Sequence, residues 1–581
     1  MNKVWKKAIK AGLILLSVLA SVKICFLGLG VDEEYAVTMS CRMVSGDRMF
    51  LEMWEPHQTS GFLSAALIRL FLFLTGRTDY MILYLRICGC LIQLLIGLFL
   101  YFTTKRYFSD DICFLAAVFF CNTLPKWIQT PEFSNMLIWF SVLCFLCLLR
   151  YYVPASGRKE EKETGSCLWL ILAGVSLSGL ILSYPSCILS VPVLLIAMRK
   201  IQSRRNGRAY LRQAGILLGT CAAAGALYVV YFLGHMSLED FFYGVSQMMR
   251  DGSHNETVGA KVLAWGQELL RLCPVVLLCL GITGCLCLCL KRLRSLSAFL
   301  TTLLCVTLLH QVVVWLGDSH YLQNPLVYFY VLFAAGFLVY EHYFRGKNTV
   351  ETFLFWAGTV FGGAVWLSAL LVTNTTISVT GPYLMTGLLS AIFLLERSFL
   401  AESVSCERPK SAFGIGGCIC LIGVTLFAKG YLVCSDEGVK DTVFMVRQKV
   451  LYGPARGIYC RYVEGYTLNR YAEILENVSV EGKKVLYLGR HSLIYLYGGQ
   501  TISNYSTIST PTFDDRLLEY WNRNPERRPE LVICDMGEEQ IKKISNLLTF
   551  DQMLAEETIL ENIPEFRIYQ VSETEEYNEY N

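Results

Sequence analysis

Long apolar runs alternate with short polar stretches along most of this 581-residue chain, up to about residue 433. About 20 apolar residues in a helix cross the core of a bilayer. The pattern predicts thirteen membrane-spanning helices, four of them short. The runs are 11–30, 82–104, 112–128, 134–150, 167–183, 185–198, 211–233, 271–290, 297–316, 325–344, 349–373, 382–396 and 411–433.

The polar remainder of the chain, residues 435–581, has a different pattern. Apolar periodicity predicts helices over 464–477, 514–524 and 540–548, and strands over 484–489, 529–535 and 566–571. Alternating helices and strands indicate a small α/β domain. We therefore expect a polytopic α-helical membrane protein of about thirteen transmembrane helices, residues 1–434, with a C-terminal extracytoplasmic α/β domain, residues 435–581.

Composition and charge support this fold class and give it an orientation. Hydrophobic residues make up 54% of the chain and charged residues 17%, with a mean hydropathy of +0.44; soluble domains carry about 25% charged residues. Basic residues precede the first run and follow every second run, which places the N-terminus in the cytoplasm of a multi-pass cell-membrane protein. The net charge of +3 gives no argument for a nucleic-acid partner.

The first predicted outside loop, residues 31–80, gathers acidic residues at the membrane surface. Asp32 and Glu33 lie at the membrane boundary, and Glu55 and His57 follow further along. These residue types supply a general base together with ligands for a divalent cation. A solvated loop with helix caps is the alternative. The apolar segment 61–76 is short for a span and predicts an interfacial or re-entrant helix.

Other predicted outside loops add candidate ligands and cations. The second loop contains Lys126 and Glu132; the glutamate is a further candidate metal ligand, or an acidic residue that suits the helix dipole. The loop over 234–269 contains Arg250, a candidate for binding a lipid phosphate. His320 and Tyr321, after the ninth run, are candidates for a shared cavity.

Acidic residues are almost absent from the predicted spans, where His310 and Gln311 are the main polar interruptions, and they concentrate at one membrane face. Transporters place such residues within the spans. This distribution favours chemistry at the membrane surface on a membrane-embedded substrate. A lipid-linked glycan transporter or flippase, or a non-catalytic envelope-assembly protein, remains the alternative.

Several motifs in order resemble the GT-C superfamily of membrane glycosyltransferases, in the branch of protein O-mannosyltransferases and aminoarabinose transferases. They are Asp32-Glu33 followed by Tyr35-Ala36, Gly46-Asp47, Glu55-Pro56, Tyr84-Leu-Arg-Ile, Glu132 and His320-Tyr-Leu-Gln-Asn-Pro. The likeness covers roughly residues 1–345. It also extends to the thirteen spans and the outside C-terminal domain.

The resemblance implies an inverting transfer of a sugar from a polyprenyl-phosphate donor to a glycan, lipid or protein acceptor of the cell envelope. Asp32 matches the position of the base, and Glu33 is the alternative. The relatives carry Glu-Lys-Pro-Pro where this chain has Glu55-Pro-His-Gln, so the lysine is missing. Arg48, Lys126 or Arg250 would then bind the phosphate, with a divalent cation as a further source of positive charge.

Overall fold

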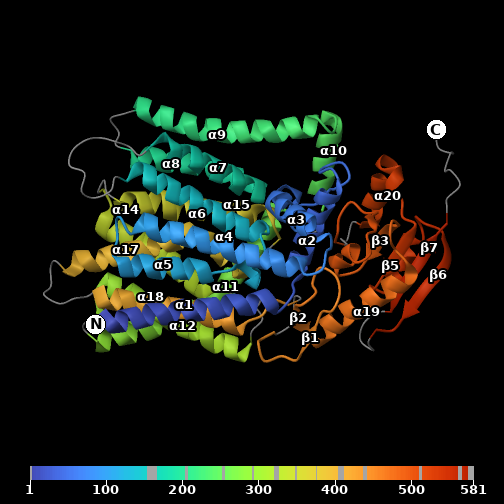
Figure 1. Ribbon diagram of the computed structural model, residues 1–581. Helices are drawn as coiled ribbons and strands as arrows, with labels where there is room; N and C mark the ends of the chain where they lie inside the picture. The colour runs from blue at the N-terminus through green and yellow to red at the C-terminus, as the bar shows by residue number, and fades with distance from the viewer. Residues whose placement is uncertain are drawn as a thin grey trace.

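The computed structural model shows a long helical bundle with a mixed sheet at one end (Figure 1). It describes residues 3–153, 166–202, 207–251, 256–290, 293–318, 326–346, 350–374, 376–403, 411–435, 441–508, 513–559 and 565–572. The N-terminal end of α1 lies at the end of the bundle opposite the sheet. The first loop and the C-terminal region therefore share one end of the bundle, as the sequence predicts.

The bundle is built from helices that run side by side. Among the described residues, eleven helical segments are long and apolar enough to cross a membrane. The long helices are α1 (Lys3–Phe26), α4 (Met81–Thr104), α6 (Phe133–Tyr152), α9 (Gly207–Leu233), α11 (Val258–Cys289), α12 (Leu296–Gly317), α13 (Val327–Val339), α14 (Val350–Phe353) continuing into α15 (Phe361–Val372), α17 (Met385–Ser403) and α18 (Ser411–Tyr431).

Two predicted spans are shorter as helices than the apolar runs suggest, namely α5 (Asp110–Asn122) and α8 (Ser190–Ile201). The short run predicted over 167–183 is α7 (Cys167–Ser183), with the same bounds. Proline accounts for the breaks at α5 and α8, because it removes a backbone donor and cannot continue a helix. Pro125 opens a 3-10 turn after α5, and Pro185 opens another before α8.

Burial divides the bundle into a centre and an outer layer. In α6, 83% of the apolar stretch is buried, against 11% in α9 and 17% in α11. The exposed side chains of these outer helices include Leu227 and Leu270. Apolar side chains facing outward are what a bilayer requires of a spanning helix.

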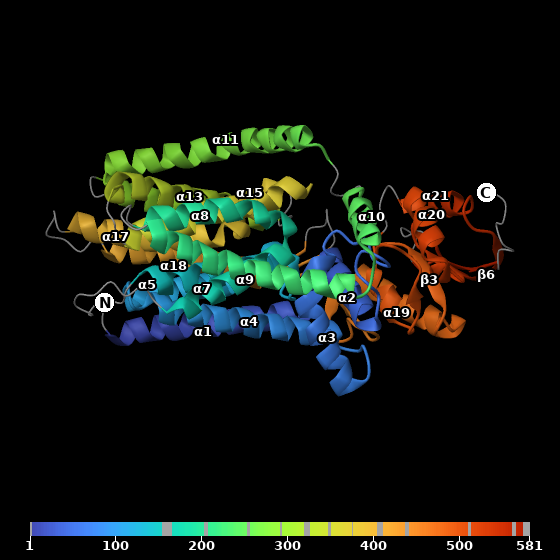
Figure 2. The same ribbon diagram turned by 90° about the horizontal axis from the view of Figure 1, so that it is seen from above.

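Three shorter helices lie where the bundle meets the C-terminal region: α2 (Val31–Ser45), α3 (Gly61–Thr75) and α10 (Leu238–Met249). Figure 2 shows α3 lying across the bundle rather than along it. This orientation fits the interfacial helix predicted over 61–76, although Gln58–Thr75 is also long and apolar enough to span. The helix α10 connects α9 to α11 at this same end.

The C-terminal region is an α/β fold around a five-stranded sheet, in the order β4-β3-β5-β7-β6. Strands β3 (Lys484–Leu488), β4 (Thr501–Ile502) and β5 (Leu531–Cys534) are parallel, whereas β7 (Phe566–Val571) and β6 (Phe550–Glu557) join antiparallel. A separate hairpin pairs β1 (Arg447–Lys449) with β2 (Tyr459–Arg461). The helices are α19 (Tyr462–Val478), α20 (Phe513–Arg523) and α21 (Glu538–Ile544).

The first loop is anchored in the core of this α/β region by Trp54. Its indole ring stacks on Tyr505 with centroids 5.6 Å apart and meets Tyr520 edge-on at 5.3 Å. The Trp54 backbone N–H donates to the carbonyl oxygen of Tyr505 over 2.9 Å. Because Trp54 is 1% exposed, the loop and the C-terminal region share one core.

Candidate functional site

The first turn of α2 contains three consecutive acidic residues, and each contacts a different part of the protein. The helix starts after Gly30, whose extended backbone lets its carbonyl oxygen accept from the N–H groups of Glu33 and Glu34. Negative side chains are favourable at this end of a helix. Asp32 pairs with Lys126, Glu33 pairs with Arg86 of α4, and Glu34 contacts His491 of the C-terminal region.

Lys126 reaches Asp32 from the loop between α5 and α6. The backbone of Lys126 and of Trp127 is left-handed, with φ of 52° and 57°. Residues other than glycine adopt this conformation at a cost, and such strain is concentrated at functional sites. The Asn135 side-chain amide holds the loop by donating to the carbonyl oxygens of Ile128 (3.1 Å) and Thr130 (2.8 Å).

The electrostatics of the ion pair favour the charged form of Lys126. Lys126 is largely buried, and burial alone would lower the pKa of its ammonium group. The charge and hydrogen bond of Asp32, together with smaller effects of Tyr383 and Glu132, outweigh burial, so the pKa of Lys126 is raised above its ordinary value. Asp32 keeps about a third of its side chain exposed (35%), which leaves it accessible to a substrate.

Glu132 lies beside this pair and caps α6. Its carboxylate accepts hydrogen bonds from the N–H groups of Asn135 (2.7 Å) and Ser134 (2.9 Å). Burial raises the pKa of Glu132 to about 7, against the opposing effects of these bonds and of Lys126. The carboxyl group therefore exchanges a proton near neutral pH, while it also caps α6, whose dipole the sequence expected it to suit.

Aromatic rings surround the charged residues. The Lys126 ammonium lies 5.3 Å from the centroid of the Phe133 ring, which stacks on His57 at 4.0 Å. Tyr184 meets the His57 ring at 5.3 Å, and Tyr383 lies 6.1 Å beyond Tyr184. Flat apolar ring faces next to charged groups are typical of sites that bind polar organic ligands.

Glu33 is engaged away from this group of side chains. Its carboxylate accepts from Nε of Arg86 over 2.8 Å and from a second guanidinium nitrogen, and both side chains are buried. Arg86 also donates to the carbonyl oxygens of Gly28 (2.7 Å) and Ile24 (2.9 Å), which fixes the end of α1. The structure thus places Asp32, not Glu33, at Lys126 and Glu132.

Glu55, His57 and Glu132 do not form the predicted metal site. Among the residues that the structure describes, no group of three or more His, Cys, Asp or Glu side chains could hold a metal ion. Glu55 is fully buried and accepts from the Thr507 N–H (2.8 Å) and the Ser506 hydroxyl (2.9 Å). His57 stacks on a ring and Glu132 caps a helix, so these residues do not fit a divalent cation.

Two predicted phosphate-binding residues lie in surface ion pairs. Arg48 donates from Nε to Glu52 over 2.7 Å, and Arg250 donates to Glu519 of α20 over 2.9 Å. Both arginine side chains are more than 40% exposed, so these pairs are solvated. His320 and Tyr321 lie outside the described residues.

A cavity of about 710 Å³ lies between α1, α4 and α5 and opens at the outer face of the bundle, where the exposed side chains of Ile14 and Leu91 line it. Gln129, from the same loop as Lys126, lines this cavity. The carbonyl of Gln129 rests on Gly89 of α4, where a Cβ atom would approach it to 1.8 Å. Space suited to a hydrocarbon chain therefore adjoins the loop that positions Lys126.

Sequence reasoning did not identify the aromatic residues of the site. Phe133 directly follows Glu132, and Tyr184 stands between two apolar runs just before Pro185. An aromatic residue at a proline break between spans is the signal that could have indicated Tyr184. Tyr383 carries a similar signal, because it follows Pro382 in the 3-10 turn Gly381–Leu384 at the start of the run 382–396.

Comparisons with known proteins give similarity at the level of structure. No protein-family model matches the chain, and no curated protein matches its sequence. The chain is similar to ArnT from Cupriavidus metallidurans, at 11% identity in the apo state over 96% of this chain and 98% of that one (TM-score 0.49). The ArnT structure bound to undecaprenyl phosphate gives 12% identity over 98% of both chains (TM-score 0.48).

The chain is also similar to an oligosaccharyltransferase from Archaeoglobus fulgidus, solved with Zn and sulfate. Identity is 14% over 90% of this chain and 67% of that one, with a TM-score of 0.46. We therefore derive the roles of Asp32, Lys126 and Glu132 from their own contacts.

Proposed function

We propose that this protein is a membrane glycosyltransferase that moves a sugar from a polyprenyl-phosphate donor to a cell-envelope acceptor, with inversion at the anomeric carbon. The observation that supports it most is the Asp32–Lys126 pair at the end of the bundle, with Glu132 and aromatic rings beside it. A carboxylate base and a cation next to each other are the two charges that such a transfer requires.

Asp32 is the proposed base. Its carboxylate takes the proton of the acceptor hydroxyl while that oxygen forms a bond to the anomeric carbon. The bond between the anomeric carbon and the phosphate oxygen breaks, and its electron pair leaves with the polyprenyl phosphate. Asp32 suits this role because it is partly exposed, whereas Glu33 is buried against Arg86.

Lys126 is the proposed partner of the leaving phosphate. Before a donor binds, its ammonium group holds the Asp32 carboxylate in place. Inversion puts the acceptor hydroxyl and the phosphate on opposite faces of the sugar, so Lys126 must exchange Asp32 for the phosphate as the donor binds. The predicted metal ligands Glu55, His57 and Glu132 are engaged in separate contacts, so the proposed step uses the charged side chains Asp32 and Lys126.

The surroundings of the pair suit the other parts of a lipid-linked sugar. The rings of Phe133, Tyr184 and His57 pack on one another and form an apolar wall beside the charged pair, next to which a sugar can bind. The apolar cavity beside Gln129 offers space for part of an isoprenoid chain. We further propose that the N-terminus is cytoplasmic and that the α/β region lies outside, following the basic residues between the spans.

Donor turnover in lipid nanodiscs tests this function. The purified protein is given radiolabelled polyprenyl-phosphate sugars together with cell-envelope extract. We expect release of polyprenyl phosphate and transfer of the labelled sugar to a component of the extract. Movement of labelled lipid across proteoliposomes without any covalent product would instead identify a transporter and refute the proposal.

A further inference from the structure

Arg516 is a fully buried cation that the proposed reaction does not use. It lies in the first turn of α20 and is 0% exposed. None of its three guanidinium nitrogens has a hydrogen-bond partner within the part of the chain that the structure describes. A buried donor without an acceptor is costly, more so when it is charged. A group that accepts hydrogen bonds from the Arg516 guanidinium would therefore stabilise this arrangement.

The contacts that Arg516 does make leave its donors available. The guanidinium lies over the Tyr505 ring, 4.1 Å from the centroid. The nearest carboxylate oxygen is Oδ2 of Asp251, 3.5 Å from Nη1, which gives attraction without a hydrogen bond. The start of α20 adds the positive end of a helix dipole. Stacking on the ring orients the planar guanidinium. A guanidinium can donate two parallel hydrogen bonds to one phosphate or carboxylate group.

Arg516 lies beside the candidate site, on the side formed by the C-terminal region. Tyr505, under its guanidinium, precedes Ser506 and Thr507, which hold Glu55 of the first loop. Glu55 is two residues before His57, whose backbone N–H donates to the Tyr35 hydroxyl of α2 over 3.4 Å. A group bound at Arg516 would therefore be close to a substrate held at α2.

We propose that Arg516, oriented by Tyr505, is the centre of a binding site for an oxyanion, a phosphate or carboxylate group carried by a substrate. The site differs from the predicted phosphate ligands Arg48 and Arg250, whose guanidinium groups already donate to carboxylates at the surface. The assignment of the anion to a substrate rests on the proposed transferase function, whereas anion binding itself does not.

Thermal unfolding of the full-length protein in nanodiscs tests the site. The melting temperature is measured in inorganic phosphate and in chloride at equal ionic strength and pH. A ligand that binds only the folded state raises the melting temperature. We expect phosphate to raise the melting temperature of the wild-type protein. Arg516→Lys should show a smaller shift, because lysine lacks the planar fork of donors, and Arg516→Met should show no shift.

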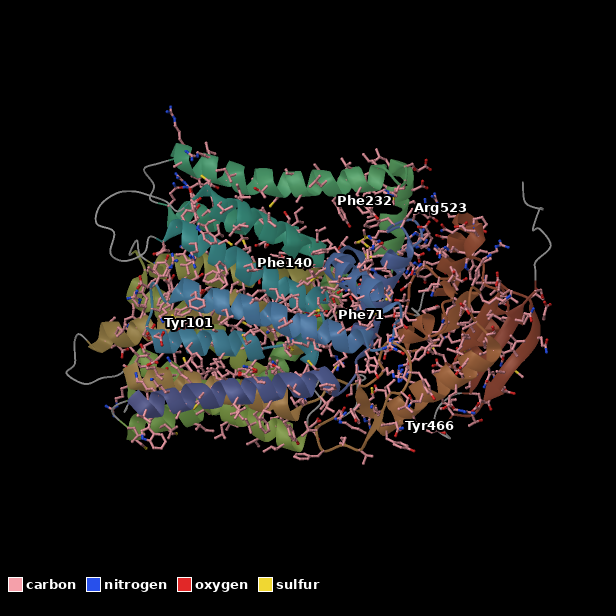
Figure 3. The ribbon with its side chains drawn as sticks, in the orientation of Figure 1. Phe71, Tyr101, Phe140, Phe232, Tyr466 and Arg523 are labelled. Atoms are coloured by element: carbon pink, nitrogen blue, oxygen red, sulfur yellow. The ribbon has the colours of Figure 1, made fainter. Side chains whose placement is uncertain are left out.

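The matched control is Arg523→Met. Arg523, labelled in Figure 3, is on the same helix but is partly exposed. It donates to Asp240 over 2.6 Å and lies over the Tyr243 ring of α10. Its phosphate-dependent shift should equal that of the wild type. If Arg516→Met fails to fold, the double variant Arg516→Met/Asp251→Asn removes both buried charges and takes its place.

Two results would overturn the proposal: no phosphate-dependent shift in the wild-type protein, or the same shift in Arg516→Met or the double variant. The source of the anion follows from a second probe, a short-chain polyprenyl phosphate. An Arg516-dependent shift with this lipid at concentrations where inorganic phosphate has no effect assigns the anion to the donor. A shift with inorganic phosphate but not with the lipid assigns it to the acceptor.

Discussion

Glu33 of α2 and Arg86 of α4 form a buried ion pair that sets the position of the neighbouring Asp32. The guanidinium group binds the Glu33 carboxylate and also the carbonyl oxygens at the end of α1, including that of Gly28. One arginine thus fixes the junction between α1 and α2. The first turn of α2 is held by this pair on one side and by Lys126 on the other.

This pair predicts a structural phenotype for Glu33. Glu33→Gln leaves Arg86 charged, buried and without its counter-ion, which costs about 3–5 kcal/mol of unfolding free energy. The double variant Glu33→Gln/Arg86→Met should recover part of that loss. Urea unfolding of the single and double variants measures both values. A loss in the double variant equal to the sum of the losses in Glu33→Gln and Arg86→Met would show that the two side chains are not coupled.

Lys126 should matter more than any other cation predicted from the sequence. Lys126→Met removes the charge that we assign to the leaving phosphate, and loss of one such group lowers turnover by about 100- to 1,000-fold. Arg48→Met and Arg250→Met are matched controls, because their exposed pairs contribute little. Steady-state kcat with a labelled donor gives the comparison. A control variant as impaired as Lys126→Met would contradict the assignment.

Glu132 should give the reaction a pH dependence near neutrality. Below a pKa of about 7 its carboxyl group is protonated and neutral; above it, a negative charge faces the incoming phosphate. The donor KM should therefore rise as the pH increases through about 7. In Glu132→Gln, which stays neutral at all pH values, the donor KM should not vary over this range. Kinetics between pH 6 and pH 8.5 test this, and a wild-type profile retained by the variant would refute it.

The same shift affects stability. A glutamate that ionises at about 4.5 in the unfolded chain and about 7 in the folded protein keeps its proton longer when folded. The favourable contribution is complete below pH 4.5 and is lost as the pH rises to about 7. Subtracting the unfolding profile of Glu132→Gln from that of the wild type isolates this effect, and a difference that does not vary between these pH values would count against it.

Glu55 should act on stability rather than on metal dependence. Its carboxylate joins the first loop to Ser506 and Thr507, so Glu55→Gln weakens a buried contact by about 1–3 kcal/mol. Any response of turnover to added divalent cations should be the same in the variant and the wild type. Titration with Mg²⁺ and Mn²⁺ after chelation tests this; a response lost only in the variant would restore Glu55 as a ligand.

Local patterns predicted the elements better than they predicted the partners of the site residues. The strand expected over 566–571 is β7 with the same bounds, and the helix expected over 464–477 is α19, Tyr462–Val478. Both elements follow from the alternation of apolar and polar residues that lie close together in the sequence. The strands β4 and β6 were not predicted, since a two-residue strand and a strand with a mostly exposed face lack such a pattern.

The acidic residues of the first loop show why roles were harder to assign. From sequence, Asp32, Glu33 and Glu55 are equivalent carboxylates at a membrane surface. Their roles depend on partners elsewhere in the chain, Lys126, Arg86 and Thr507, which only the folded protein brings to them. Arg516 is a further case, because its sequence neighbours give no sign that its guanidinium is buried.

The most direct test of the proposed function is turnover by Asp32→Asn. Asparagine keeps the size and polarity of the side chain but cannot accept the proton of the acceptor hydroxyl. Wild type and variant are compared in nanodiscs, with thermal unfolding as the control for folding and labelled polyprenyl-phosphate sugars as donors. We predict sugar transfer by the wild type and none by a folded variant; undiminished transfer by the variant would show that Asp32 is not the base.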